Sequence, residues 1–213
     1  MPSKVKAYLE KNGAKYEELS HKTVFTAYDA AATLKNELKQ IAKNLLIEAD
    51  KTHVLVIVPA DKKLDLGKLK KALGAKKVSI PKEQVVVKIL KIKPGAISSF
   101  GKLHKLEVVL DKTMTGVKEA VFSTGSFTDS VLMKVKDFVQ MEEAKLADIA
   151  MKGGYVIPKT VKKQMKKIKK VLKAKKPVKV VKKPIKKIIK KAVKKVVKKT
   201  VKKAIKKATK KKK

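Results

Sequence analysis

The chain has no cysteine, no tryptophan and no arginine, and only three of its 213 residues are histidine. The missing cysteine excludes disulfide bonds, thiolate zinc sites and a cysteine nucleophile. An all-histidine zinc site would need His21, His53 and His104 to converge, so we expect no metal and no cofactor. Arginine is the residue that reads guanine edges through a planar fork, whereas lysine binds phosphate as a point charge. Any nucleic acid is therefore expected to be recognised through its backbone charge.

Long apolar runs are also missing. Residues 1–12 are polar and charged, without the apolar centre of a signal peptide, so secretion is not expected. No apolar run approaches the roughly 18 to 20 residues that a membrane-spanning helix needs. The sequence therefore predicts a cytoplasmic protein that is not embedded in a membrane.

Charge is distributed very unevenly along the chain. All eighteen acidic residues precede Lys159, and the lysines from Lys159 onward supply +29 of the net charge of +39. The remaining +10 is compatible with an ordinary basic domain. We predict a folded domain over residues 1–154, ending near Gly153 and Gly154, and a lysine-repeat tail over residues 155–213.

The tail repeats a four-residue unit with paired lysines. A helix turns every 3.6 residues, so a period of four drifts by about 40° per repeat and leaves no fixed apolar face. Pro177 and Pro184 interrupt its start, so we expect an extended or transiently helical tail. Without arginine, and without an aromatic residue after Tyr155, base reading and stacking by the tail are not expected. We predict a sequence-blind nucleic-acid tether whose contacts include Lys182, Lys183, Lys186, Lys187, Lys190, Lys191, Lys194 and Lys195.

The sequence pattern of residues 1–154 predicts an α+β domain. Thr26 and Asp29 have the spacing of a capping box at the start of a helix. Asp65 and Gly74 bracket a second helical pattern, and Ser3 is a candidate cap for a first helix that stops at Gly13. The expected helices are 3–12, 27–34, 65–73, 81–89 and 136–142, and the expected strands are 15–20, 43–47, 53–59, 78–80, 106–110, 119–123, 131–135 and 146–150. Residues 94–101 should form an ordered loop.

No catalytic motif is visible from residue chemistry alone. The domain lacks a Ser-His-Asp spacing, a phosphate-binding glycine loop of the P-loop type and a paired-carboxylate motif. A single carboxylate such as Asp111 gives no acid–base pair, so a structural hydrogen-bonding role at a strand end is expected for it. From chemistry alone the chain is an α+β domain attached to a polycation.

The order of several landmarks carries more information than any one of them. These are residues 21–31 (HKTVFTAYDAA), 41–45 (IAKNL), 54–59 followed by 61–66 (DKKLDL), the loop 95–101, Asp111, and 124–126 (TGS). In this order they resemble the YbaK/ProX family of aminoacyl-tRNA deacylases, which are related to the editing domain of bacterial prolyl-tRNA synthetases. The resemblance runs over about residues 3–150.

The resemblance implies a mixed, curved β-sheet flanked by helices. It implies hydrolysis of the ester that joins a wrongly attached amino acid to the 3′-terminal adenosine of a tRNA. Lys43 would be the family lysine that meets phosphate or polar groups of the terminal nucleotide. Gly95 would offer backbone N–H groups to the ester carbonyl, since a glycine allows close approach. We therefore expect Lys43 and Gly95 to be the catalytic positions.

The remaining candidate substrate-binding residues follow from the same resemblance. Ser99 stands where the family's glycine loop has proline, which brings the rigidity of the loop into question. His21 could act as a general base, but the family's water activation is credited to the ribose hydroxyl and backbone groups, so a pocket-forming or structural role is expected. The full set is His21, Thr26, Ser98, Ser99, Gly101, Asp111, Gly125 and Ser126.

Three functions remain open at this point. The first is an editing hydrolase whose tail concentrates mischarged tRNA or holds the enzyme near ribosomes or a synthetase. The second is a non-enzymatic, histone-like protein that binds DNA or ribosomal RNA and keeps the editing fold only as a pocket. The third is a tail that binds anionic membrane surfaces through lysines placed next to valine and isoleucine.

Overall fold

The structure is a computed structural model that describes residues 1–92 and 95–151. The predicted domain boundary at Gly153 and Gly154 and the predicted lysine tether lie outside these described residues. Within them, no helix has both the length and the apolar character needed to cross a bilayer.

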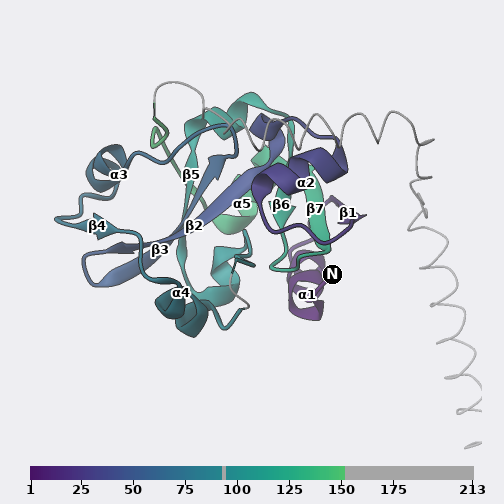
Figure 1. The fold of residues 1–213 in the computed structure, drawn as a ribbon, viewed down its shortest axis with the longest axis horizontal. Coiled ribbons are helices and arrows are strands. Elements are labelled where there is room, and N and C mark those ends of the chain that lie inside the picture. Colours follow the sequence, from purple (N-terminus) through teal and green to yellow (C-terminus); the bar gives the residue numbers. More distant parts are fainter. Residues whose placement is uncertain (93–94, 152–213) are drawn as a thin grey trace, which may run out of the picture. The chain divides into compact units, whose positions relative to one another are not determined.

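A mixed five-stranded sheet forms the centre of the domain (Figure 1). β2 and β3 make an antiparallel hairpin, β5 runs parallel to β3, β8 runs parallel to β5, and β4 pairs antiparallel with the end of β2. The strands are β2 (Ala42–Ala49), β3 (Thr52–Pro59), β4 (Val78–Ser79), β5 (Glu107–Asp111) and β8 (Lys145–Ala147). The sheet order is β4-β2-β3-β5-β8, so the predicted mixed sheet is confirmed.

A second, antiparallel sheet has three strands in the order β1-β7-β6. They are β1 (Tyr16–Ser20), β6 (Glu119–Ser123) and β7 (Asp129–Lys134). A single parallel bridge between Ile41 and Val121 joins the start of β2 to β6. The one curved sheet expected from the resemblance is thus divided in two, and the two sheets meet beside residues 41–44.

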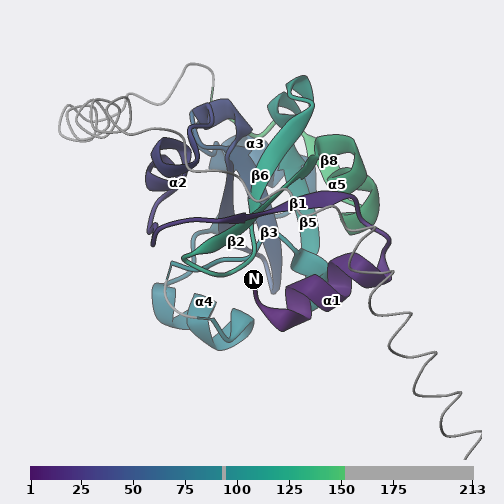
Figure 2. The same ribbon diagram turned by 90° about the vertical axis from the view of Figure 1, so that its right-hand side faces the viewer.

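Five helices flank the sheets (Figure 2). They are α1 (Ser3–Lys11), α2 (Ala27–Leu34), α3 (Leu66–Leu73), α4 (Glu83–Leu90) and α5 (Val135–Glu142). The capping box of Thr26 and Asp29 is present, and Asp65 and Gly74 cap α3 as predicted. The prediction that Ser3 caps α1 is wrong, because Pro2 occupies the N-cap position and no side chain bonds there.

The two faces of the central sheet pack against different helices. Leu55 and Ile57 of β3 pack with α1 and α5 in a cluster that includes Phe122 and Phe138. The alternate residues of β3, with Ile47 of β2, pack with Leu69 of α3. Successive side chains of a strand point to opposite faces, so neighbouring residues of β2 belong to different environments. This alternation decides where Lys43 and Asn44 point.

Gly101 is required by packing in this core. A methyl group at Gly101 would lie 2.5 Å from Val108 Cγ2 and 3.3 Å from Leu55 Cδ2. We expect Gly101→Ala to lower the free energy of unfolding by about 1–3 kcal/mol, because the packed core must move to admit the methyl group. Urea unfolding would measure this change. Gly116→Ala is the matched control, since nothing lies within 4 Å of its added carbon; equal losses in the two variants would contradict the packing argument.

Candidate functional site

The loop after α4 is fixed by one fully buried hydroxyl group. Ser99 Oγ donates a hydrogen bond to Asn44 Oδ1 at 3.1 Å and accepts one from Ser123 N at 3.0 Å. Ser99 N donates to Ser123 O at 2.9 Å, and Asn44 Nδ2 donates to Ile97 O at 2.9 Å. We call Asn44, Ser99 and Ser123 the Ser99 anchor. It attaches the loop to β2 on one side and to β6 on the other.

Two glycines with positive φ angles lie in loops that contact each other. Gly95 has φ +80° and Gly125 has φ +82°, a region that other residues enter at a cost. A β-carbon on Gly125 would lie 3.4 Å from Ser98 Cβ and 3.5 Å from Ala96 O, so the bare backbone of Gly125 faces the other loop. We call residues 95–99 and 124–128 the glycine loops.

The first glycine loop carries backbone donors without an internal partner. The N–H groups of Ala96, Ile97 and Ser98 form no hydrogen bond with any described residue. Ala96 is 4% exposed and Ser98 is 5% exposed. Backbone N–H groups in buried residues such as Ala96 and Ser98 are usually paired, so donors without a described partner are candidates for binding a ligand oxygen.

His21 is held by both of its ring nitrogens. Nδ1 lies 2.9 Å from Lys22 O and Nε2 lies 3.0 Å from Ser130 Oγ. A carbonyl oxygen only accepts, so Nδ1 carries a proton, and Nε2 of the neutral ring then accepts from the Ser130 hydroxyl. The lone pair that a general base would use is occupied. The geometry therefore gives His21 the structural role expected for it.

Ser126 belongs to a small cluster around Asp129. Ser126 Oγ donates to Asp129 Oδ2 at 2.8 Å and Thr128 Oγ1 donates to the same oxygen at 2.7 Å. Burial opposes ionisation of Asp129, but these hydroxyl donors and the Met1 ammonium group outweigh it and lower the pKa of Asp129 to about 2. The cluster stabilises the second glycine loop.

Lys43 and Asn44 leave β2 on opposite faces. Asn44 bonds to the first glycine loop, whereas Lys43 Nζ donates to Lys62 O in the turn after β3. Burial, partly offset by the nearby Asp61 carboxylate, lowers the pKa of Lys43. Asp61 Oδ1 is itself buried and has no hydrogen-bond partner among the described residues. Lys43 and Gly95 remain predictions as catalytic positions, and Asn44 is the residue of β2 that bonds to the first glycine loop.

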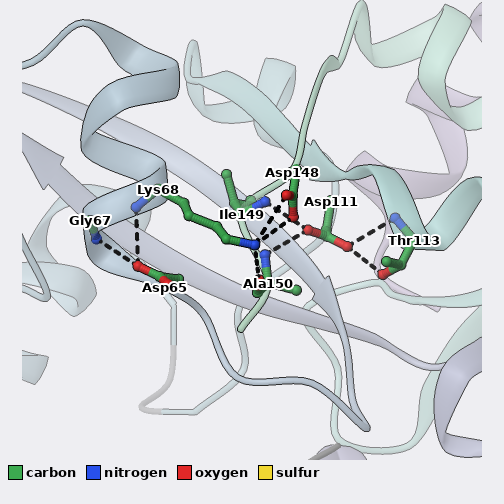
Figure 3. Close-up of polar contacts among 8 residues, drawn as sticks. All are labelled: Asp65, Gly67, Lys68, Asp111, Thr113, Asp148, Ile149 and Ala150. Atoms are coloured by element: carbon green, nitrogen blue, oxygen red, sulfur yellow. Dashed lines mark hydrogen bonds and ion pairs between the residues drawn. The ribbon is translucent and has the colours of Figure 1, made fainter. Parts of the chain in front are cut away.

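Two other residues predicted to contact the substrate, Gly101 and Asp111, make contacts within the domain. Gly101 is buried in the hydrophobic core against Val108, as described above. Asp111 is fully buried, and its carboxylate accepts from Thr113 N and Oγ1 and from Ile149 N and Ala150 N (Figure 3). These four bonds agree with a structural role for Asp111 at a strand end, since each carboxylate oxygen accepts two of them.

Residues around Asp111 also hold the end of the described chain in place. Lys68 Nζ donates to both carboxylate oxygens of Asp148, at 2.9 and 3.0 Å, and to Ala150 O at 2.8 Å (Figure 3). With the two bonds from Ile149 and Ala150 to Asp111, these contacts form what we call the C-terminal clasp. Thr26, by contrast, stays at the surface, where its hydroxyl group serves the capping box.

Comparison with known proteins agrees with this arrangement of fold and loops. The family model of the aminoacyl-tRNA editing domain matches residues 21–141. That span contains both glycine loops, the Ser99 anchor and Lys43. The chain therefore belongs to the aminoacyl-tRNA editing domain family.

Individual relatives cover the described domain. The chain is 29% identical over 144 residues to the prolyl-tRNA editing protein ProX of Acetoanaerobium sticklandii, which spans 65% of this chain and 88% of that protein. It is 26% identical over 147 residues to the multifunctional Ser/Thr-tRNA deacylase ProXp-y of Escherichia coli K12, over 67% and 88% of the two chains. A solved structure described as a candidate trans-editing enzyme for prolyl-tRNA synthetase has a TM-score of 0.61 at 24% identity, covering 71% of this chain and 99% of that one, and supports the fold.

The Ser99 anchor predicts coupled losses of stability. We expect Ser99→Ala to lower the free energy of unfolding by about 1–3 kcal/mol, because the Asn44 carbonyl and the Ser123 N–H lose their partner. A double-mutant cycle with Asn44→Ala, measured by urea unfolding, should give a coupling energy of about 0.5–3 kcal/mol. Ser79→Ala, whose hydroxyl bonds at the surface to Glu48, is the control and should change stability by less than about 0.5 kcal/mol. Strict additivity of Ser99→Ala and Asn44→Ala would contradict the anchor.

The Asp129 cluster predicts a dependence of stability on acid pH. The folded-state pKa of Asp129, about 2, lies below its ordinary value of 3.8, so the carboxylate stabilises the fold above pH 3.8 and loses this effect as the pH falls toward 2. Relative to Asp129→Asn, the native chain should gain about 2 kcal/mol near neutral pH and nothing near pH 2. Chemical denaturation at several pH values measures the difference. Ser126→Ala removes one donor and should shift this loss to higher pH; an unchanged profile would refute the assignment.

Proposed function

We propose that this protein hydrolyses the ester bond of mischarged aminoacyl-tRNA. The observation that carries the proposal is the match of residues 21–141 to the aminoacyl-tRNA editing domain. The N–H groups of Ala96, Ile97 and Ser98, which bond to no described residue, lie within this span and support it. Relatives named as a prolyl-tRNA editing protein and a Ser/Thr-tRNA deacylase support the same class of reaction.

The first glycine loop supplies the electrostatic part of this reaction. When water attacks the ester carbonyl, the carbonyl oxygen becomes an oxyanion, and the carbon–oxygen bond to the ribose then breaks with a proton passing to the ribose oxygen. Backbone N–H groups of residues 96–98 would donate to the developing oxyanion. The Ser99 anchor holds these donors in place before the substrate binds, so little reorganisation is needed in the transition state. His21 acts here as a support of the second glycine loop.

Lys43 supplies a cation on the other side of β2. Its ammonium group is half-buried, and burial lowers its pKa. In its charged form it can meet phosphate of the terminal nucleotide. Asp61 lies close enough to affect this charge, and its unpaired Oδ1 can accept a hydrogen bond from a polar group of the substrate. The tRNA end would then reach both faces of the first half of β2.

The tail acts as a nucleic-acid tether in this proposal. Met151 N donates to Lys63 O at 2.9 Å, next to the Lys62 carbonyl that accepts from Lys43. The C-terminal clasp fixes residues 148–150, so the described chain ends beside the residues that hold Lys43. A polycationic tail would raise the local concentration of tRNA or hold the enzyme near ribosomes or a synthetase.

Hydrolysis is tested with a panel of mischarged tRNAs. The full chain should deacylate at least one member, and Lys43→Ala should reduce kcat/KM by about 10-fold or more, as expected for the loss of a charged contact of 1.5–3 kcal/mol. Release of the labelled amino acid measures the rate. Lys51→Ala is the matched control, since Lys51 is an exposed lysine in the turn between β2 and β3. A chain that hydrolyses no panel member while condensing DNA would favour the histone-like function instead.

The tether is tested by truncation after Tyr155. At saturating tRNA the shortened chain should keep its kcat, because the residues of the site are all retained. Its KM should exceed that of the full chain at low salt, and the difference should vanish at high salt, since each engaged lysine changes log K by about 0.7–0.9 per log unit of salt. Equal KM values for both chains at low salt would exclude a tether that acts on tRNA. Flotation with anionic liposomes tests the membrane alternative.

The lowered pKa of Lys43 predicts the alkaline limit of activity. If the ammonium form is required, kcat/KM should fall, after subtraction of the uncatalysed rate, at a pH below the ordinary lysine pKa of about 10.4. Lys43→Arg keeps its charge throughout this range and should show no such fall, whatever its absolute rate. The same alkaline limb in both chains would assign the titration to another group.

A further inference from the structure

Phe25 is exposed at the surface beside the glycine loops. Its side chain is 69% exposed, the highest value among the large hydrophobic residues that the structure describes. Burying a phenylalanine side chain normally contributes about 1.5–3 kcal/mol to stability, and this residue forgoes most of that gain. An isolated exposed residue needs no explanation, but Phe25 has an aromatic neighbour.

That neighbour is Phe127, in the second glycine loop. The two ring centroids lie 5.2 Å apart, with the ring planes inclined by 51°. The backbones that carry them are joined, because Val24 N donates to Phe127 O at 2.9 Å and His21 N donates to Thr128 O at 2.8 Å. The two rings are therefore presented together by two fixed segments.

The pair borders the first glycine loop. A β-carbon on Gly95 would lie 3.9 Å from Cε1 of Phe127, so the ring lies next to the position that a side chain at residue 95 would occupy. The unpaired N–H groups of residues 96–98 follow directly in the chain. The two rings and these donors therefore border the same loop.

Aromatic surface of this kind suits a nucleobase. Bases stack on phenylalanine rings with about 1–3 kcal/mol each by alanine substitution, whatever their identity. An aminoacylated RNA end carries its ester on the ribose of an unpaired terminal nucleoside, so a base lies one sugar away from the reacting carbonyl. Ile80, which is 60% exposed, is aliphatic and offers no such surface.

We propose that Phe25 and Phe127 form a stacking platform for the unpaired 3′-terminal nucleobase of the aminoacylated RNA. The inference rests on the proposed function for the identity of the ligand. The platform contributes to binding and leaves the chemical step to the glycine loops. It also accounts for the exposure of Phe25 and the contact between the two loops.

Two minimal esters separate stacking from hydrolysis. One is an aminoacyl ester of adenosine, and the other carries the same amino acid on a ribose without a base. Phe25→Ala should raise KM for the adenosine ester about 5- to 150-fold at similar kcat, and should leave the baseless ester unchanged. Phe25→Tyr should keep the native KM, and Ile80→Ala is the control for loss of exposed apolar surface. Equal effects of Phe25→Ala on both esters would overturn the platform.

A binding measurement keeps the platform testable if no ester is hydrolysed. Adenosine 5′-monophosphate should bind the full native chain more tightly than ribose 5-phosphate does in calorimetric titration, and Phe25→Ala should abolish the difference. Because Phe25 is mostly exposed, its replacement should change stability by less than about 0.5 kcal/mol, which thermal unfolding checks. Equal binding of the two phosphates to the native chain refutes the platform. Absence of ester hydrolysis together with preferential nucleotide binding refutes the proposed function alone.

Discussion

One buried hydroxyl group holds the functional end of the domain together. Ser99 Oγ bonds to Asn44 in the five-stranded sheet and to Ser123 in the three-stranded sheet, and it has no exposure to water. Its hydrogen bonds fix the backbone of the first glycine loop to both sheets. The first glycine loop, whose Ala96, Ile97 and Ser98 N–H groups bond to no described residue, is positioned by this anchor.

Local chemistry in the sequence was sufficient to predict most of the secondary structure. The capping box of Thr26 and the Asp65 and Gly74 caps are contacts between residues a few positions apart, so their spacing alone indicates them. The strands of the β2–β3 hairpin were visible as apolar runs separated by a polar turn. The wrong prediction at Ser3 also concerns neighbouring residues. Pro2 occupies the N-cap position, and Ser3 is the first residue of the helix.

The assembly of the site could not be predicted in this way. The Ser99 anchor joins residues 24 and 55 positions apart, and no local pattern specifies such a pairing. The resemblance drew attention to Lys43, but the alternation of side chains along β2 gives the contact with the loop to Asn44. Asn44 was visible in the sequence only as the uncharged polar residue next to Lys43 in the predicted strand 43–47. Asp61, Phe25 and Phe127 were not predicted either, because unpaired buried atoms and exposed ring pairs are properties of the folded chain.

The C-terminal clasp has a mechanical consequence. A force applied to the domain at Met151 would first load the bonds from Ile149 and Ala150 to Asp111 and from Lys68 to Asp148 and Ala150. These bonds connect the chain end to β5 and α3. A force on Met151 would therefore be distributed over both elements and would not act on β8 alone. Tension reaching Lys63 through Met151 would also be transmitted to the neighbouring carbonyl that holds Lys43. The described chain thus ends in a segment that is held by several bonds and contacts the turn that bonds to Lys43.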